Sequence, residues 1–91
     1  MFPFPKFFKA IGDPTRQQIL QLLNKNGEMP VKDIVDNLDL AQSTVSHHLG
    51  ILKDAGIIQS REDGTQTYYS VCCSTIADCC LGMKKFFDDK N

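Results

Sequence analysis

The hydrophobic residues in the first half of the chain recur at helical spacing in two segments. Asp13 can cap free backbone N–H groups, and Pro14 suits the first position of a helix because its missing N–H needs no partner there. Apolar residues then form one face until Gly27 ends the segment, which predicts a helix over residues 14–25. The following segment VKDIVDNL has the same spacing over two turns and predicts a short second helix over residues 31–38.

The next segment, AQSTVSHHLGILKDAG, predicts a helix with one hydrophobic side and one polar side. The hydrophobic side contains Ala41, Val45, His48, Leu49, Leu52 and Ala55. The polar side contains Ser43, Ser46, His47 and Gly50. Asp39 and Gln42 have the spacing of a capping box, so we predict that Asp39 caps this helix and that Gly56 ends it.

Two β-rich runs, IIQSRE and TQTYYSV, flank the dipeptide Asp63-Gly64, which is a strong signal for a β-hairpin. The last segment, STIADCCLGMKKFFDD, returns to helical spacing, with an apolar stripe of Ile76, Cys80, Met83 and Phe87. The order is therefore an aromatic N-terminal piece, a helix, a short helix, a polar-faced helix, a hairpin and a helix. This order predicts a winged helix-turn-helix, which is a mainly α fold with a β-hairpin wing (α+β).

Composition limits the size of the fold and the partners that it can bind. With 91 residues, 42% of them hydrophobic, the chain predicts a single domain over residues 1–91 that is marginal alone and favours a homodimer. The net charge of −1 argues against broad non-specific binding, so any contact with double-stranded DNA must be local. There is no run of 18 apolar residues, and two prolines interrupt the N-terminal segment, so we expect a soluble cytoplasmic protein with no membrane contact.

The polar-faced helix is predicted to enter the major groove of DNA with its N-terminal residues against base edges. The candidate residues for base or phosphate contact are Gln42, Ser43, Ser46 and His47. In the hairpin, Arg61, Thr65 and Gln66 are candidates for contact with the backbone or the minor groove. The alternatives are a solvated helix and a wing that is merely exposed. His48 lies on the apolar side, so we predict that it is packed and contacts no base.

Three segments together resemble one known family: FKAIGDPTRQQILQLL, LAQSTVSHHLGILKDAGII and DGTQTYYSV are similar to the arsenic-repressor (ArsR/SmtB) family of metal-sensing winged-helix repressors. The resemblance covers nearly the whole chain. It implies a homodimer built on N- and C-terminal helices that binds its operator without a cofactor and leaves it when an inducer binds. One departure is Ala41, where many relatives have a capping serine.

Two metal sites that are common in this family are absent from the sequence. Many arsenic sensors of the family have a Cys-Val-Cys motif in the short helix, and the two thiol positions are occupied here by Pro30 and Lys32. Zinc sensors of the family use aspartate and histidine on the C-terminal helix, and the corresponding segment here contains no histidine. A metal inducer must therefore bind elsewhere.

All four cysteines lie within the nine residues CCSTIADCC, at positions 72 to 80. Disulfide scaffolds spread their cysteines along the chain, so the cluster favours a local thiol site in a reduced compartment. Thiolates without histidine suit a thiophilic ion. The spacing resembles a C-terminal arsenite site in one branch of the family, which implies Cys72, Cys73 and Cys79 as As(III) ligands and leaves Cys80 to pack beside the apolar stripe.

Two other roles for the cysteines stay open. The thiols could form a redox or persulfide switch, because neighbouring thiols oxidise to strained, easily reduced disulfides, or they could bind cadmium, lead or zinc. An enzyme is not expected. A thiol reductase would need Cys-x-x-Cys or a cysteine at the start of a helix in a βαβ setting, and the sequence has neither.

Overall fold

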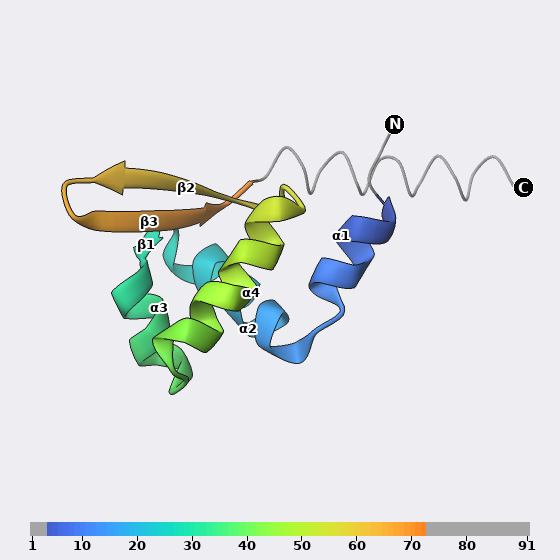
Figure 1. The fold of residues 1–91 in the computed structure, drawn as a ribbon, viewed down its shortest axis with the longest axis horizontal. Coiled ribbons are helices and arrows are strands. Elements are labelled where there is room, and N and C mark those ends of the chain that lie inside the picture. Colours follow the sequence, from blue (N-terminus) through green and yellow to red (C-terminus); the bar gives the residue numbers. More distant parts are fainter. Residues whose placement is uncertain (1–3, 73–91) are drawn as a thin grey trace, which may run out of the picture.

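The computed structural model describes residues 4–72 of the chain, which form a helical body with a β-hairpin extending from it (Figure 1). The helices are α1 (Phe4–Ile11), α2 (Pro14–Asn26), α3 (Val31–Leu38) and α4 (Gln42–Asp54), and the strands are β1 (Met29–Pro30), β2 (Ile58–Asp63) and β3 (Gln66–Val71). The predicted winged helix-turn-helix is confirmed, with α3 and α4 as the helix pair and β2 and β3 as the wing. None of the helices within residues 4–72 is long and apolar enough to cross a membrane.

Helix α2 begins and ends as its sequence predicts. The Asp13 side chain accepts a hydrogen bond from the backbone N–H of Arg16 at 3.0 Å, and Pro14 occupies the first turn. At the other end, Gly27 has φ 75° and its N–H donates to the Leu23 carbonyl oxygen at 2.8 Å. Glycine adopts this positive φ without the steric cost that a Cβ would bring. The cap and the glycine therefore fix both ends of α2.

The turn between α3 and α4 differs from the prediction. Asp39 does not cap α4, because it ends α3 in the left-handed conformation with φ 53°. The N-cap of α4 is Ala41, which makes no side-chain capping hydrogen bond. The chain must reverse direction sharply between the two helices, and aspartate tolerates the left-handed region better than most residues. The capping-box prediction was wrong because the turn uses Asp39 for its backbone conformation.

The wing belongs to a three-stranded antiparallel sheet in the order β1-β3-β2. Along the hairpin, Ile58 is opposite Val71 and Asp63 is opposite Gln66, so Gly64 and Thr65 form the two-residue loop. Strand β1, which pairs Met29 with Tyr69, was not predicted from the residue pattern. A proline is compatible with β1 because this strand lies at the edge of the sheet. This short strand joins the base of the wing to the segment between α2 and α3.

The residue pattern predicted an aromatic N-terminal segment but no helix where α1 lies. Only the family resemblance implied a helix there. Phe7 and Ala10 face inward from α1 and complete a core that lies among all four helices and the base of the hairpin. The fully buried large side chains of the core are Ile19, Leu23, Ile34, Val45, Leu49, Leu52 and Ile57. Because α2, α3 and α4 all contribute to this list, the core fixes the position of α4 in the body.

Candidate nucleic-acid interface

The exposed side of α4 presents the four side chains that the sequence predicts for DNA contact. Gln42, Ser43, Ser46 and His47 are all exposed. They follow one another at positions i, i+1, i+4 and i+5, so they lie on one face near the N-terminal end of the helix. Within residues 4–72, none of the four makes a side-chain hydrogen bond or ion pair, although the His47 ring lies 5.7 Å from that of His48. Their polar groups are available to a partner.

The opposite side of α4 anchors the helix in the core. Val45, Leu49 and Leu52 are each at most 1% exposed, and Ala55 is buried just beyond the helix. Ala41, predicted on the hydrophobic side, is exposed. Gly56 follows with φ 75° and its N–H donates to the Lys53 carbonyl oxygen, which ends the helix as predicted. Burial of one side thus determines which residues the other side presents.

Gly50 lies one turn beyond Ser46 on the exposed side. A Cβ placed on Gly50 would have no atom within 4 Å, so packing within residues 4–72 gives no reason for a glycine. Glycine in a helix interior costs roughly 0.5–1 kcal/mol relative to alanine. The exposed side of α4 therefore has no side chain at Gly50, and the helix is less stable there than it would be with alanine.

The exposed side of α4 is uncharged as far as Leu52, and the exposed Lys53 in the last turn is its first charged residue. Between Gln42 and Leu52 the helix contains no lysine, arginine, aspartate or glutamate. If residues 42–52 contact DNA, those contacts would be neutral hydrogen bonds to bases or phosphates, apart from any charge on the two histidines. Such a face selects partners by hydrogen-bond pattern more than by long-range attraction.

His48 is directed away from this face, as the sequence predicts for a packed histidine. Its side chain is 14% exposed, and its Nδ1 lies 3.2 Å from a terminal nitrogen of Arg16. Asp13 is also close, with 3.9 Å between its Oδ2 and the same Nδ1. The backbone N–H of Arg16 is the main cause that lowers the pKa of the Asp13 carboxyl. The contact with Arg16 was not predicted, because Arg16 and His48 are 32 positions apart in the sequence.

The wing arginine is already engaged within the chain. Arg61 donates from two nitrogens to the Glu28 carboxylate, at 2.7 Å and 3.1 Å, and a third nitrogen lies 3.6 Å from Asp63. Its guanidinium also lies 4.9 Å from the centre of the Tyr68 ring. The hydrogen bond from Arg61 lowers the pKa of Glu28, and the same pair raises the pKa of Arg61. Thr65 and Gln66 are exposed at the end of the hairpin.

The predicted thiol site lies mostly outside the described residues. Cys72 directly follows β3 and is half-buried, whereas Cys73, Cys79 and Cys80 lie outside residues 4–72. The Cys72 backbone N–H donates to the Ile57 carbonyl oxygen at 2.7 Å, and the Ile57 N–H donates to the Leu52 carbonyl oxygen at 3.0 Å. Two backbone hydrogen bonds therefore connect Cys72 with the last turn of α4. Within residues 4–72 no cluster of three or more histidine, cysteine or acidic side chains is placed to hold a metal ion.

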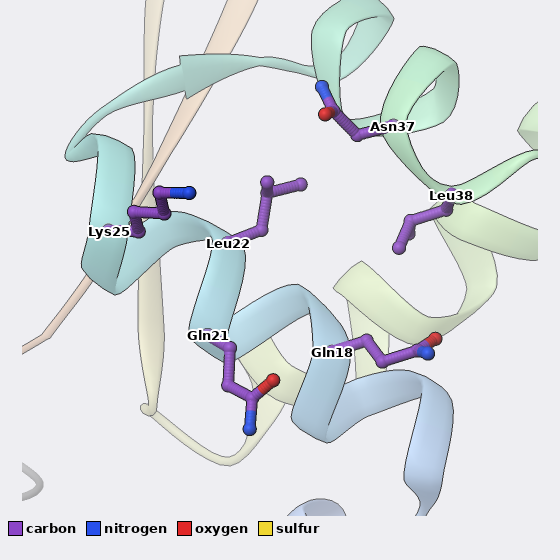
Figure 2. A pocket seen from close by; sticks show the side chains of 6 residues that line it. All are labelled: Gln18, Gln21, Leu22, Lys25, Asn37 and Leu38. Carbon is purple, nitrogen blue, oxygen red and sulfur yellow. The ribbon is translucent and has the colours of Figure 1, made fainter.

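A separate pocket of about 300 Å³ lies between α2 and α3, away from the exposed side of α4 (Figure 2). Leu22 and Leu38 form its apolar part, and Gln18, Gln21 and Asn37 also line it. Lys25 is the single ionisable side chain of this lining. The lining contains none of the residues that the sequence predicts for DNA contact.

A helix-turn-helix whose second helix presents exposed polar groups, followed by a hairpin wing, defines a winged-helix DNA-binding regulator. The family described as "Bacterial regulatory protein, arsR family" matches residues 13–60. The chain belongs to this family of transcriptional regulators.

Comparison with individual proteins agrees with this assignment. The chain is 53% identical to the uncharacterized HTH-type transcriptional regulator MJ1325 of Methanocaldococcus jannaschii, over 72% of this chain and 74% of the relative. It is 41% identical to the transcriptional repressor SdpR of Bacillus subtilis, over 89% of both chains. A crystal structure of a possible transcriptional regulator for arsenical resistance superposes with a TM-score of 0.77 at 29% identity, over 88% of this chain and 82% of that one.

Relatives that are named for cadmium, mercury or arsenic resistance are 36–41% identical, and the chain spans 51–58% of their lengths. The names of MJ1325 and SdpR refer to no metal. Family membership thus establishes a transcriptional regulator, and the inducer has to be argued from the residues of this chain.

Proposed function

We propose that this chain is a repressor that binds operator DNA as a homodimer and is released when trivalent arsenic, or antimony, binds thiolates of Cys72, Cys73 and Cys79. The observation that carries the DNA-binding part is the exposed side of α4. Gln42, Ser43, Ser46 and His47 present polar groups that have no hydrogen-bond partner within residues 4–72, on a helix whose other side is anchored in the core. Glutamine can pair with adenine through two hydrogen bonds, and serine and histidine can contact bases or phosphates.

The wing has a secondary role in this proposal. Thr65 and Gln66 are exposed at its end and can reach the DNA backbone or the minor groove. Arg61 already uses two of its five N–H donors on the Glu28 carboxylate, so a phosphate would have to compete with that carboxylate or bind the donors that remain. When the logarithm of the DNA-binding constant is plotted against the logarithm of salt concentration, the slope is about −0.9 for each phosphate that the protein neutralises. Because residues 42–52 of α4 include no lysine or arginine, DNA contacts by this part of the helix should contribute little to the salt dependence.

Two-fold symmetry gives each α4 its own half-site. Helix-turn-helix dimers bind half-sites about one helical turn apart, so the angle between subunits decides whether both contacts form. Phe8 of α1 is 42% exposed, which is consistent with an apolar contact surface at this helix. We propose that α1 and the C-terminal stripe form the dimer interface, with Phe2, Phe4, Phe7 and Phe8 from one end of the chain and Ile76, Met83, Phe86 and Phe87 from the other.

The thiolate part of the proposal is supported by donor chemistry and by the position of Cys72. Trivalent arsenic prefers three sulfur ligands, and the chain gathers its four cysteines into nine residues. Ligand binding at Cys72 would act on a backbone that two hydrogen bonds connect with Leu52 at the end of α4. A shift of this backbone, together with a change in subunit angle, would move α4 relative to the DNA. The DNA would then be released because α4 no longer fits its half-site, without any repulsion between charges.

The names of the relatives support a metal as the inducer without selecting one. An arsenical resistance operon repressor of Escherichia coli is 36% identical to this chain, and a cadmium resistance regulator of Staphylococcus aureus is 41% identical. The experiment therefore titrates reduced protein, bound to a duplex that it selected from a random library, with arsenite, cadmium and zinc in parallel. Arsenite should release the duplex at the lowest concentration. Release by cadmium or zinc alone would assign the thiolates to another metal.

A cysteine series tests the ligand set. Cys72→Ser, Cys73→Ser and Cys79→Ser should each bind the duplex like the parent but stay bound in arsenite, because a hydroxyl remains protonated where a thiolate would coordinate. Cys80→Ser is the matched control and should respond almost like the parent. The site is wrong if Cys80 proves essential and Cys79 dispensable. Release by oxidant alone, reversed by a thiol reductant, would instead identify a redox switch.

A further inference from the structure

The structure assigns to Arg16 a role that rests on the proposed DNA reading by α4: Arg16 is a positioning residue that sets the orientation of α4 through His48. Its side chain lies where three helices meet. The Arg16 Nε donates to the Ala10 carbonyl oxygen at 2.6 Å and a terminal nitrogen donates to the Lys9 carbonyl oxygen at 3.2 Å. Both carbonyl groups belong to the last turn of α1, where the helix has no following turn whose backbone N–H groups could donate to them. The other terminal nitrogen contacts His48 on α4 at 3.2 Å.

The chemistry of arginine fixes the direction of the contact with His48. A guanidinium has five N–H donors and no acceptor, so the ring nitrogen must accept. The His48 Nδ1 therefore carries no proton in this arrangement, and the neutral ring has its proton on Nε2. Asp13 does not replace Arg16 as the partner, because 3.9 Å is too long for a hydrogen bond and its Oδ2 already accepts from the Arg16 backbone. One planar group thus connects α1, α2 and α4.

The position of His48 makes this contact relevant to DNA reading. His48 is adjacent in sequence to His47, whose exposed ring lies 5.7 Å from that of His48. The hydrogen bond at His48 limits rotation of α4 about its own axis, and such a rotation would move His47 and Ser46 together. Helix α1 and the exposed side of α4 are therefore coupled by Arg16. A second polar link between the same two helices, Lys6 to Asp54 at 3.5 Å, is exposed and lies at the far end of α4.

The test compares operator binding among folded variants. His48→Leu keeps an apolar side chain but removes the acceptor, and it should bind the selected duplex about 10-fold more weakly than the parent. His48→Asn places an oxygen acceptor near the position of Nδ1 and should recover affinity to within about threefold. Arg16→Met should weaken binding at least as much as His48→Leu, because it removes the contact with His48 and the two hydrogen bonds to α1. The double variant should be no weaker than Arg16→Met, because the contact with His48 is already lost there.

Lys6→Met is the matched control for loss of a polar link between α1 and α4, and it should change affinity by less than about twofold. Thermal unfolding of every variant separates lost folding from lost positioning. Nitrogen NMR of the His48 ring in the parent needs no variant, and it should report a bare Nδ1 and a protonated Nε2 at neutral pH. The opposite tautomer, or parent-like binding by folded His48→Leu, would overturn the role of Arg16. Failure of the parent to select any duplex would instead overturn the proposed function.

Discussion

Helix α4 and the hairpin wing are both candidate DNA-binding elements, but their polar groups are used differently. The exposed side of α4 is uncharged from Gln42 to Leu52, and Gln42, Ser43 and Ser46 make no side-chain hydrogen bonds within residues 4–72. The wing is charged, and Arg61 is bound to Glu28 and lies against Tyr68. The polar groups of Gln42, Ser43 and Ser46 are therefore available for intermolecular hydrogen bonds. In the wing, the Arg61–Glu28 ion pair instead holds the hairpin against the helical body. We infer that α4 supplies most of the sequence selectivity.

The two elements also differ in how they are anchored, and Leu49→Ala should give the largest effect on stability. Leu49 is 1% exposed and lies on the buried side of α4, so its truncation leaves a cavity in the core. The expected loss is about 2–5 kcal/mol of unfolding free energy, measured by urea denaturation. Ser46→Ala on the opposite side of the same helix should stay within about 0.5 kcal/mol of the parent. Equal losses would contradict the separation of the two sides of α4.

The next effect concerns operator affinity. Ser46→Ala and His47→Ala should each weaken binding to the selected duplex by about 1–3 kcal/mol if their side chains contact bases. Fluorescence anisotropy at fixed salt measures this loss, and arsenite binding by the same variants should not change. If both variants bind like the parent, α4 does not read DNA through these residues.

A smaller effect is expected at Gly50, where stability and binding should change in opposite directions. Gly50→Ala should raise the unfolding free energy by about 0.5–1 kcal/mol, because alanine favours the helix and its Cβ meets open space. If DNA approaches α4 closely at this point, the added methyl group should weaken operator binding. A stabilised variant with unchanged affinity would show that DNA does not approach Gly50.

The smallest effect is expected from the wing and depends on pH. Arg61 lowers the pKa of Glu28, so their pair stabilises the fold above the usual titration range of a glutamate. This contribution is lost as the pH falls through the lowered pKa of the folded state. Glu28→Gln should therefore speed hydrogen exchange in β2 and β3 at neutral pH and lose its effect in acid. Glu62→Gln is the control on the same hairpin, and an equal change in it would argue against the pair.

Local signals explain which parts of the fold the sequence predicts. Asp13, Pro14 and Gly27 act within a few residues of themselves, and so do the alternation and turn residues of the hairpin. The exposed residues of α4 follow from helical periodicity alone. These features could be predicted because neighbours along the chain determine them.

The features that sequence reasoning missed depend on distant partners. Strand β1 exists only because Met29 pairs with Tyr69, and Glu28 meets Arg61 across 33 residues. Asp39 fits a capping box locally, but the tertiary turn between α3 and α4 demands its left-handed backbone. The cysteine ligand set could be proposed from spacing and resemblance, and Cys73 and Cys79 lie outside the described residues.

The most direct test of the central claim measures sequence selectivity in both elements. The ratio of affinities for the selected duplex and a scrambled duplex is determined for the parent, the Ser46→Ala/His47→Ala double variant and Arg61→Gln. The parent should prefer the selected duplex by about 10³-fold or more. The double variant should lose most of this preference, whereas Arg61→Gln should keep it. Loss of preference in Arg61→Gln, with preference retained in the double variant, would contradict the assignment of DNA reading to α4.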